Sequence, residues 1–349
     1  MMVNPDLLSK GCQLCQKGKW LCIFLTYKCN AGCHFCPAPF RDDRISSSFW
    51  NNKEEILSNL GKTAFKGISF SGGDPFLVFE RLLEWQAYFK KNLPGYYYWV
   101  YTNGLAVTEE KMRRLSAAGM NEIRFNIAAT GYINQDIWNK IEAARKIFPV
   151  VSVEIPSIAK DFGLLETALD KMERTRINLL NLHDYILNDA DVKSESLQSF
   201  EFILNKVIPL KYAVSSVENT ERIIKLTQKK GYSFVINHCS MQQKELQMVQ
   251  RRFKMGKLFN NPDYDLVLPD GTICNFYSVP ETMTSFEFQM RSAKPDFRGR
   301  YSSFMLKIND PVINEDSGDG FIKVFYIPQM GTDQDKIYLR TEAGQVEKI

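Results

Sequence analysis

Apolar segments of two kinds alternate along most of the chain. Short apolar and β-branched runs predict strands, at positions 20–26, 67–70, 96–101, 122–127, 150–155, 177–182 and 231–237. Apolar residues at helical spacing predict helices at positions 49–60, 76–91, 109–118, 133–147, 164–174 and 242–257, and residues 194–230 are expected to be largely helical with an interruption at Pro209. Strands that alternate with helices form a parallel sheet with covered faces. We therefore expect an α/β fold, a partial (β/α)6 TIM-like barrel.

The last part of the chain has a different pattern. Residues 263–349 contain short β-like runs separated by Pro, Gly and Asp turns, which predicts a small antiparallel domain. We place its boundary near Asn261 and Pro262. The chain then consists of an N-terminal CxxC extension (1–19), the barrel (20–260) and a C-terminal β-rich domain (261–349). This domain either covers the mouth of an incomplete barrel and selects the substrate, or only stabilises the chain.

Composition and charge narrow the class of protein. Charged residues make up 24% and apolar residues 44% of the 349 positions, as in an ordinary soluble enzyme. A net charge of +4 is too small to indicate nucleic acid as a partner. No leader-like apolar segment opens the chain, and no apolar run approaches the roughly 18 residues of a membrane span, so we expect a cytoplasmic protein with no membrane partner. The absence of GxGxxG, Walker-type and GxSxG motifs disfavours dinucleotide, NTP and serine-hydrolase functions.

Cysteines carry the clearest chemical signal. The chain has eight, and six of them precede residue 37; clustered thiols in a reducing compartment indicate metal. Cys29, Cys33 and Cys36 follow one another at offsets of four and three, and the residues 30–32 allow the tight curl that brings them together. Three thiolates suit a cubane iron–sulfur cluster with one iron left open, whereas a closed zinc site needs a fourth protein ligand. Alone, the loop is compatible with either metal.

Two further polar turns follow predicted strands, which is where parallel sheets bind ligands. The first is SGGDP at residues 71–75. Its two glycines let the backbone approach a ligand closely, and its carboxylate can accept hydrogen bonds from an ammonium group. A plain glycine turn is the alternative. The second is TNG at residues 102–104, which is either a ligand contact or a simple tight turn.

These motifs resemble those of the radical S-adenosylmethionine (radical SAM) superfamily. CNAGCHFC, with the aromatic Phe35 before the third cysteine, resembles the CxxxCxxC signature. SGGDP resembles the GGEP motif, with Asp74 in place of the usual Glu. The resemblance implies a 4Fe-4S cluster on Cys29, Cys33 and Cys36, whose fourth iron is held by the amino group and carboxylate of SAM. It also implies that the SGGDP turn contacts the SAM amino group.

Other strand ends extend the expected cofactor site. TNG is similar to a turn that lies near SAM in the activating enzymes of glycyl-radical proteins, and His183 lies where those enzymes have a histidine near SAM, although a structural core histidine is the alternative. Arg124 and Asn126 alternate with Phe125 and Ile127, and the pattern leaves open which pair faces the barrel interior. The residues expected to bind the cofactor are Phe35, Ser71, Gly72, Gly73, Asp74, Thr102, Asn103, Asn126 and His183.

A second metal site is one interpretation of the remaining cysteines. Cys12 and Cys15 form a CxxC pair, which is half of a zinc or iron–sulfur site. Cys239, with His238 or Cys274, could complete an auxiliary zinc or iron–sulfur centre. The alternative is that Cys239 and Cys274 are isolated buried thiols, since no second closely spaced pair exists.

Over residues 11–258 the chain is similar to an uncharacterised group of archaeal and bacterial radical SAM proteins that resemble pyruvate formate-lyase activating enzymes. The resemblance implies reductive cleavage of SAM to a 5'-deoxyadenosyl radical, which abstracts hydrogen from an unidentified metabolite, peptide or nucleoside. It also implies an electron donor such as flavodoxin or ferredoxin. One alternative is a glycyl-radical-enzyme activase, although the chain lacks the ferredoxin-like insertions that many activases carry. The alternative of another class is a non-enzymatic zinc or iron–sulfur binding module. No catalytic residue is assigned.

Overall fold

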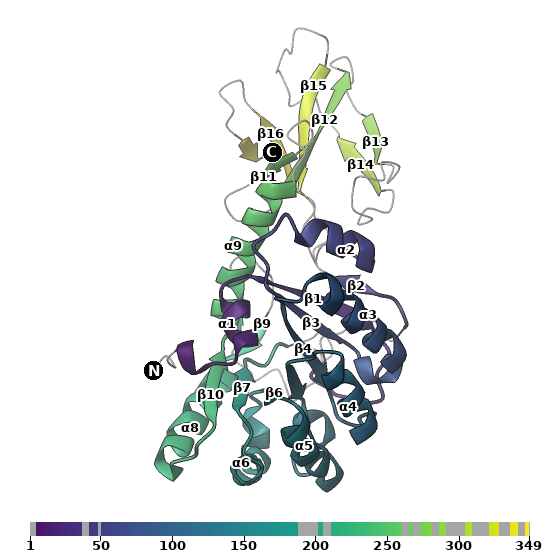
Figure 1. Ribbon diagram of the computed structural model, residues 1–349. Coiled ribbons are helices and arrows are strands. Elements are labelled where there is room, and N and C mark those ends of the chain that lie inside the picture. Colours follow the sequence, from purple (N-terminus) through teal and green to yellow (C-terminus); the bar gives the residue numbers. More distant parts are fainter. Residues whose placement is uncertain are drawn as a thin grey trace. The chain divides into compact units, whose positions relative to one another are not determined.

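The fold was analysed in a computed structural model of the chain (Figure 1). The structure describes residues 5–36, 42–47, 50–187, 202–204 and 211–259, and seven strands within the C-terminal part. The chain divides into two compact units, Met1–Met248 and Val249–Ile349. The boundary expected near residue 261 lies outside the described residues and stays a prediction.

One eight-stranded sheet organises the first unit. Its strand order is β10-β7-β6-β5-β4-β3-β1-β2, in which seven strands are parallel and β2, at one edge, is antiparallel to β1. Within the described residues the edge strands β10 and β2 do not pair, so the sheet is not closed into a barrel. The strands are β1 Trp20–Thr26, β2 Ser46–Ser47, β3 Gly67–Gly72, β4 Tyr97–Thr102, β5 Glu122–Phe125, β6 Val150–Pro156, β7 Leu179–His183 and β10 Val235–Cys239.

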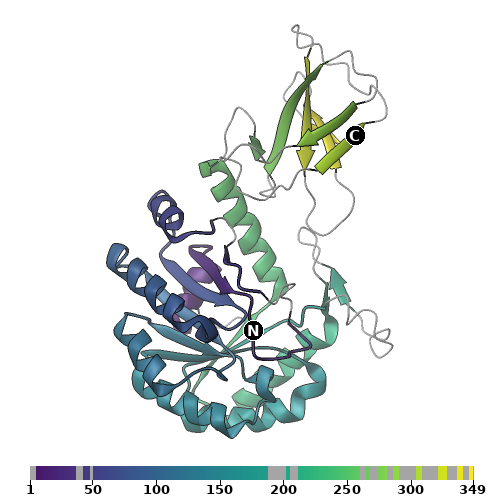
Figure 2. The ribbon, with the colours of Figure 1, turned by 90° about the vertical axis from the view of Figure 1, so that its right-hand side faces the viewer.

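Helices connect the successive parallel strands. They are α2 Lys53–Leu60, α3 Phe79–Asn92, α4 Glu109–Ala117, α5 Gln135–Ile147, α6 Phe162–Thr175 and α8 Val214–Lys230. Figures 1 and 2 show α3 to α6 and α8 following one another around the outer side of the curved sheet. An N-terminal helix, α1 (Lys10–Gln16), precedes β1, and α9 (Met241–Phe259) follows β10. A short pair of strands, β8 (Phe202–Leu204) and β9 (Lys211–Ala213), precedes α8.

Local sequence signals explain several helix ends. The Asn52 side chain caps α2 by accepting a hydrogen bond from the backbone N–H of Glu55 at 2.7 Å. Thr108 caps α4 in the same way. Gly231, with φ of 67°, ends α8 in the left-handed conformation that glycine adopts without strain. These caps set the lengths of the helices, and therefore the points at which the chain returns to the sheet.

The two faces of the sheet have different partners. Phe125 of β5 lies on the outer face, beside Ile137 of α5 and Gly104. Arg124, its neighbour on the strand, lies on the opposite face, where its guanidinium approaches Gly11 of α1. We call the face that carries Arg124 and is covered by α1 the inner face. This arrangement answers the question that the alternation on β5 left open.

The α/β partial barrel expected from the sequence is confirmed, and the strand expected at 231–237 is found as β10, the seventh parallel strand of the sheet. One expectation fails locally. Within the segment 194–230, the described residues 202–204 and 211–213 pair as strands, and helix α8 begins at Val214. Helix α1 was not predicted, because its sequence KGCQLCQ has too few apolar residues to show a helical period.

The second unit is β-rich, as expected. Five antiparallel strands follow the order β11-β12-β15-β16-β17, and β13 and β14 form a separate pair. Their bounds are β11 Asp265–Val267, β12 Ile273–Pro280, β13 Phe286–Met290, β14 Phe304–Ile308, β15 Phe321–Ile327, β16 Lys336–Arg340 and β17 Val346–Lys348. Among the described residues of the whole chain, no helix is both long and apolar enough to cross a membrane.

Candidate functional site

The three motif cysteines lie on the loop that leaves the carboxyl end of β1. Cys29, Cys33 and Cys36 are partly exposed, and none is in a disulfide. The backbone N–H of Cys36 donates to the carbonyl of Cys33 at 3.2 Å, which makes the tight turn expected for this spacing. Within the described residues, no three Cys, His, Asp or Glu side chains are gathered as a ready-made metal site. The donor set of three thiols without a carboxylate nevertheless fits an iron–sulfur cluster.

Gly72, which ends β3, and Gly73 allow the SGGDP turn to lie against the start of the cysteine loop. A side chain on Gly72, whose φ is +119°, would begin 2.0 Å from the carbonyl oxygen of Thr26, and one on Gly73 would begin 1.9 Å from that of Lys28. The backbone N–H groups of Gly73 and Asp74 donate to these two carbonyls at 2.7 and 2.9 Å. Both glycines are therefore required by the fold itself, next to Cys29.

Asp74 is fully buried and is bonded within the protein. One carboxylate oxygen accepts from the backbone N–H of Phe76 at 2.9 Å. The other accepts from the Thr102 hydroxyl at 2.9 Å and from the backbone N–H of Asn103 at 2.8 Å. Burial raises the pKa of this carboxyl group, against these hydrogen bonds, which lower it. Asp74 thus joins the turn after β3 to the turn after β4, and its contact with the SAM amino group stays a prediction.

Asn103 links the turn after β4 to the cysteine loop. Its side-chain amide nitrogen donates to Asn30 Oδ1 at 2.9 Å and lies 3.5 Å from Cys29 Sγ. Its Oδ1 accepts from the backbone N–H of Leu105 at 2.9 Å. The structure therefore brings together three of the predicted elements: the first cysteine, SGGDP and TNG.

Ser71 and Asn126 lie at neighbouring strand ends. Ser71 is partly exposed near the end of β3, beside Phe24 of β1. Asn126 follows β5, and its backbone N–H donates to the Thr102 carbonyl at 2.8 Å. Its side-chain oxygen accepts from the backbone N–H of Ala129. Ser71 is thus the first residue of the SGGDP turn, and Asn126 adjoins TNG through its hydrogen bond to Thr102.

Phe35 and His183 lie further along the sheet edge. Phe35 packs against Ile158 and Tyr185, so the cysteine loop reaches the side of the sheet on which β7 ends. His183 ends β7, and two strands, β5 and β6, separate it from β4. Burial lowers the pKa of His183 to about 4, and the ammonium of Lys244 lowers it as well. The imidazole is therefore neutral near pH 7, with Nδ1 3.1 Å from the carbonyl of Asp184.

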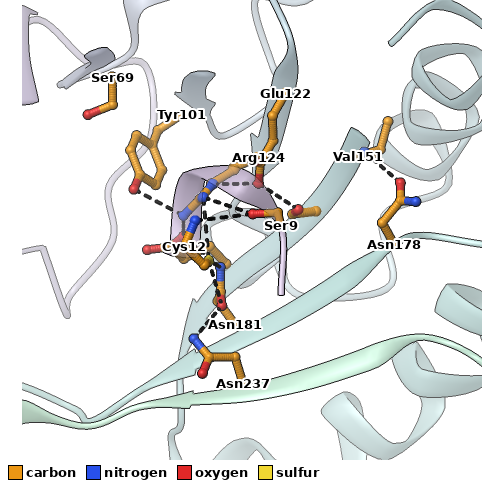
Figure 3. A network of polar contacts seen from close by, with 12 residues as sticks. Ser9, Cys12, Ser69, Tyr101, Glu122, Arg124, Val151, Asn178, Asn181 and Asn237 are labelled. Atoms are coloured by element: carbon orange, nitrogen blue, oxygen red, sulfur yellow. Dashed lines mark hydrogen bonds and ion pairs between the residues drawn. The ribbon is translucent and has the colours of Figure 1, made fainter. Parts of the chain in front are cut away.

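A buried ionic network occupies the inner face (Figure 3). Arg124 is 3% exposed, and its guanidinium donates to Glu122 at 2.8 Å and to Glu154 at 2.7 Å. Burial raises the pKa of Glu154, but the charges of Arg124 and Lys244 outweigh this, so that the pKa is lowered and the carboxylate stays ionised. Sequence reasoning missed this network, although the charged and apolar alternation of EIRF in a buried strand was its signal.

The cysteines of the expected auxiliary site have other neighbours. Cys12 Sγ accepts from the guanidinium of Arg124 at 3.4 Å and from the side-chain amide of Asn181 at 3.3 Å, and burial raises the pKa of its thiol to about 11. Burial also raises the pKa of Cys15 and of Cys239, and the neighbouring Cys239 raises the pKa of Cys15 further.

The structure also places the other two ligands named for the auxiliary site, His238 and Cys274. His238 Nε2 lies 2.8 Å from a carboxylate oxygen of Asp184. Cys274 lies on β12, in the second unit. The auxiliary metal site stays a prediction.

Comparisons with known proteins identify relatives of the chain. Residues 23–161 match the sequence profile of the Radical SAM superfamily. A curated protein of Methanocaldococcus jannaschii is 27% identical over 285 residues, which cover 77% of this chain and 73% of the relative. Its provisional name is that of a glycyl-radical enzyme activating enzyme.

Solved structures resemble the chain more distantly. Streptococcus suis SuiB bound to the precursor peptide SuiA has a TM-score of 0.44 at 9% identity, over 63% of this chain and 48% of SuiB. The radical S-adenosylmethionine methyltransferase TsrM from Kitasatospora setae, with cobalamin and a [4Fe-4S] cluster bound, has a TM-score of 0.36 at 14% identity, over 46% of this chain and 36% of TsrM. The chain thus spans about half of SuiB and less of TsrM, and neither score supports a conclusion about its activity.

Proposed function

We propose that the chain is a radical SAM enzyme that holds a 4Fe-4S cluster on Cys29, Cys33 and Cys36 and cleaves SAM reductively, as the match of residues 23–161 to the Radical SAM superfamily supports. One observation carries the proposal: the turns after β1, β3 and β4 are tied together at one sheet edge through Asp74 and Asn103. When bound, the cluster supplies the electron that splits SAM into methionine and a 5'-deoxyadenosyl radical, which takes hydrogen from the substrate.

The chain's own residues position and shield this chemistry. Gly72 and Gly73 keep the turn after β3 against the backbone that leads to Cys29. Asp74 fixes the turn after β4 relative to it, as its two hydrogen bonds from that turn show. Phe35, packed against the cluster of Ile158, Tyr185 and Ala213, excludes water from one side of the cysteine loop. We propose that the methionine end of SAM binds at this edge, with Ser71, Asn126 and His183 around the rest of the molecule.

The inner-face ends of β6 and β7 are the proposed substrate wall. Glu154, whose side chain is 17% exposed, accepts from Arg124 and from Asn181 through Oε2. His183 and Lys244 are partly exposed and lie near Glu154, and the ammonium of Lys244 attracts its carboxylate. A wall that combines a carboxylate, an ammonium and a neutral imidazole suits a polar substrate, such as a metabolite, a peptide or a nucleoside.

A second candidate is activation of a glycyl-radical enzyme. The name of the M. jannaschii relative favours it. In this case the hydrogen would come from a glycine of a partner protein. For either candidate, a one-electron donor such as flavodoxin or ferredoxin would reduce the cluster.

The test is anaerobic reconstitution with iron and sulfide, followed by incubation with SAM and dithionite. We expect about four irons per chain, as a 4Fe-4S cluster requires, and release of 5'-deoxyadenosine and methionine by mass spectrometry. Cys29→Ala, Cys33→Ala and Cys36→Ala should each abolish release. Cys22→Ala, on β1, is the matched control that removes a thiol outside the loop.

The proposal would be rejected if the loaded protein released neither product. A colourless protein that holds zinc but no iron or sulfide would instead identify a metal-binding module. Incubation with a glycyl-radical enzyme from the same genome, followed by electron paramagnetic resonance (EPR), would distinguish the activase from the small-substrate enzyme. A glycyl radical would favour the activase, and its absence, with SAM turnover intact, would favour a small substrate.

A further inference from the structure

Asn103 was expected to bind SAM, but its side chain is already engaged. The residue is 7% exposed. Its Oδ1 accepts from the backbone N–H of Leu105, and its amide nitrogen faces two acceptors, Asn30 Oδ1 at 2.9 Å and Cys29 Sγ at 3.5 Å. An amide nitrogen has two hydrogens, so these contacts account for both. The Asn103 side chain therefore points toward the first cysteine of the loop, and both of its polar atoms have hydrogen-bond partners.

The side-chain amide of Asn103 is held in position by the fold before any cluster binds. Asp74, which is fully buried, accepts the backbone N–H of Asn103 at 2.8 Å and the Thr102 hydroxyl at 2.9 Å. The Thr102 hydroxyl oxygen in turn accepts from the backbone N–H of Gly104 at 3.0 Å. The amide of Asn103 is thus held on a rigid turn, and little ordering remains to be done when it donates to sulfur.

Cys29 Sγ also has a donor from its own loop. The backbone N–H of Ala31 lies 3.5 Å from the sulfur. Two N–H groups therefore point at one sulfur, one local and one from the end of β4. Donors to a cluster thiolate stabilise negative charge on the sulfur, and hydrogen bonds to the sulfurs are among the factors that set a cluster's reduction potential.

We propose that Asn103 is a positioning residue that donates to Cys29 Sγ, holds the first cluster ligand in place and raises the reduction potential of the cluster. This inference rests on the proposed function, because it requires a cluster at these cysteines. Reduction adds one electron, supplied by dithionite, and breaks no bond in the protein. The reduced cluster carries more negative charge than the oxidised one, so loss of the donor disfavours the reduced form.

The test is an EPR-monitored redox titration of the loaded, full-length protein. Asn103→Leu keeps the size of the side chain and removes the donor without adding charge. We expect the ratio of reduced to oxidised cluster at a fixed potential to fall about tenfold, which is a negative shift of about 59 mV for one electron. Asn139→Leu, the same change at an exposed position of α5, is the matched control and should leave the midpoint unchanged. Equal midpoints in the two variants would overturn the proposal.

A variant that loses its cluster is tested in the metal-free protein. Amide hydrogen exchange of residues 29–33 should be faster in Asn103→Leu than in Asn139→Leu, because the loop loses its link to β4. Equal exchange would overturn the positioning role. This measurement does not depend on SAM cleavage, so a failure of the proposed function and a failure of this inference are distinguishable.

Discussion

The carboxylate of Asp74 accepts the Thr102 hydroxyl at 2.9 Å, which joins the ends of two adjacent parallel strands in a fully buried position. Asp74→Asn keeps the shape of the side chain but replaces one oxygen with a donor, so that the hydrogen bonds to that oxygen become unfavourable. We expect a loss of about 1–3 kcal/mol in the free energy of unfolding. Urea denaturation measures it. Asp136→Asn, at an exposed carboxylate of α5, should cost less than about 1 kcal/mol; equal losses would contradict the role given to Asp74.

Gly73 tests the close approach of the turn after β3 to the cysteine loop. Gly73→Ala places a methyl group 1.9 Å from the carbonyl oxygen of Lys28, so the two backbones must separate. We expect destabilisation by about 1–3 kcal/mol, together with reduced iron content after reconstitution. Gly163→Ala is the control, because its added methyl group meets no atom within 4 Å. It should be neutral or stabilising, by less than about 1 kcal/mol. If Gly73→Ala behaved like Gly163→Ala, the packing of this turn would be misjudged.

Arg124 tests the ionic network of the inner face. Arg124→Met leaves the carboxylates of Glu122 and Glu154 without their cation, and a broken buried pair typically costs about 3–5 kcal/mol. Adding Glu122→Gln should recover part of this loss, because one of the uncompensated charges is removed. Arg113→Met, which breaks an exposed pair with Glu109, should change the free energy of unfolding by less than about 1 kcal/mol. Urea denaturation of the four proteins checks the order of stabilities.

His183 predicts a pH dependence of stability. Burial lowers its folded pKa to about 4, from 6.5 in the unfolded chain. Below pH 6.5 the unfolded state takes up a proton that the folded state does not, so the stability contributed by His183 is lost as the pH falls from 6.5 to 4. The free energy of unfolding of the wild type should therefore fall more steeply over this interval than that of His183→Gln. Parallel curves would show that the imidazole titrates normally.

The order of the strands was predictable because apolar runs and helical periods differ strongly along the chain. Strands β1 and β4 are found at their expected positions, and so are the polar turns that follow them. Helix α1 was missed because KGCQLCQ has no periodic apolar face, and its place depends on packing against Trp99 and Arg124. Side-chain direction on β5 was also undetermined, since the whole strand is buried and alternation alone does not say which face meets which partner.

The chemical motifs were predictable as a set, but not the connections between them. Periodicity places SGGDP and TNG at strand ends, and parallel strands bring those ends together. It does not show that both carboxylate oxygens of Asp74 accept hydrogen bonds from the protein itself, or that the side chain of Asn103 points toward Cys29. These are tertiary contacts, which depend on the spacing of paired strands rather than on local sequence. The sequence likewise did not show which backbone approaches Gly72, because that backbone belongs to another strand, β1.

The contact between Asn103 and Cys29 has a consequence for maturation of the protein. These residues follow β4 and β1, and β3 lies between those two strands in the sheet. Donor and sulfur therefore meet only after three strands, far apart along the chain, have paired. A chain in which this pairing is lost keeps its cysteines but loses the amide that steadies the first of them. If a cluster binds at these cysteines, as proposed, iron retention would report whether the three strands have paired correctly.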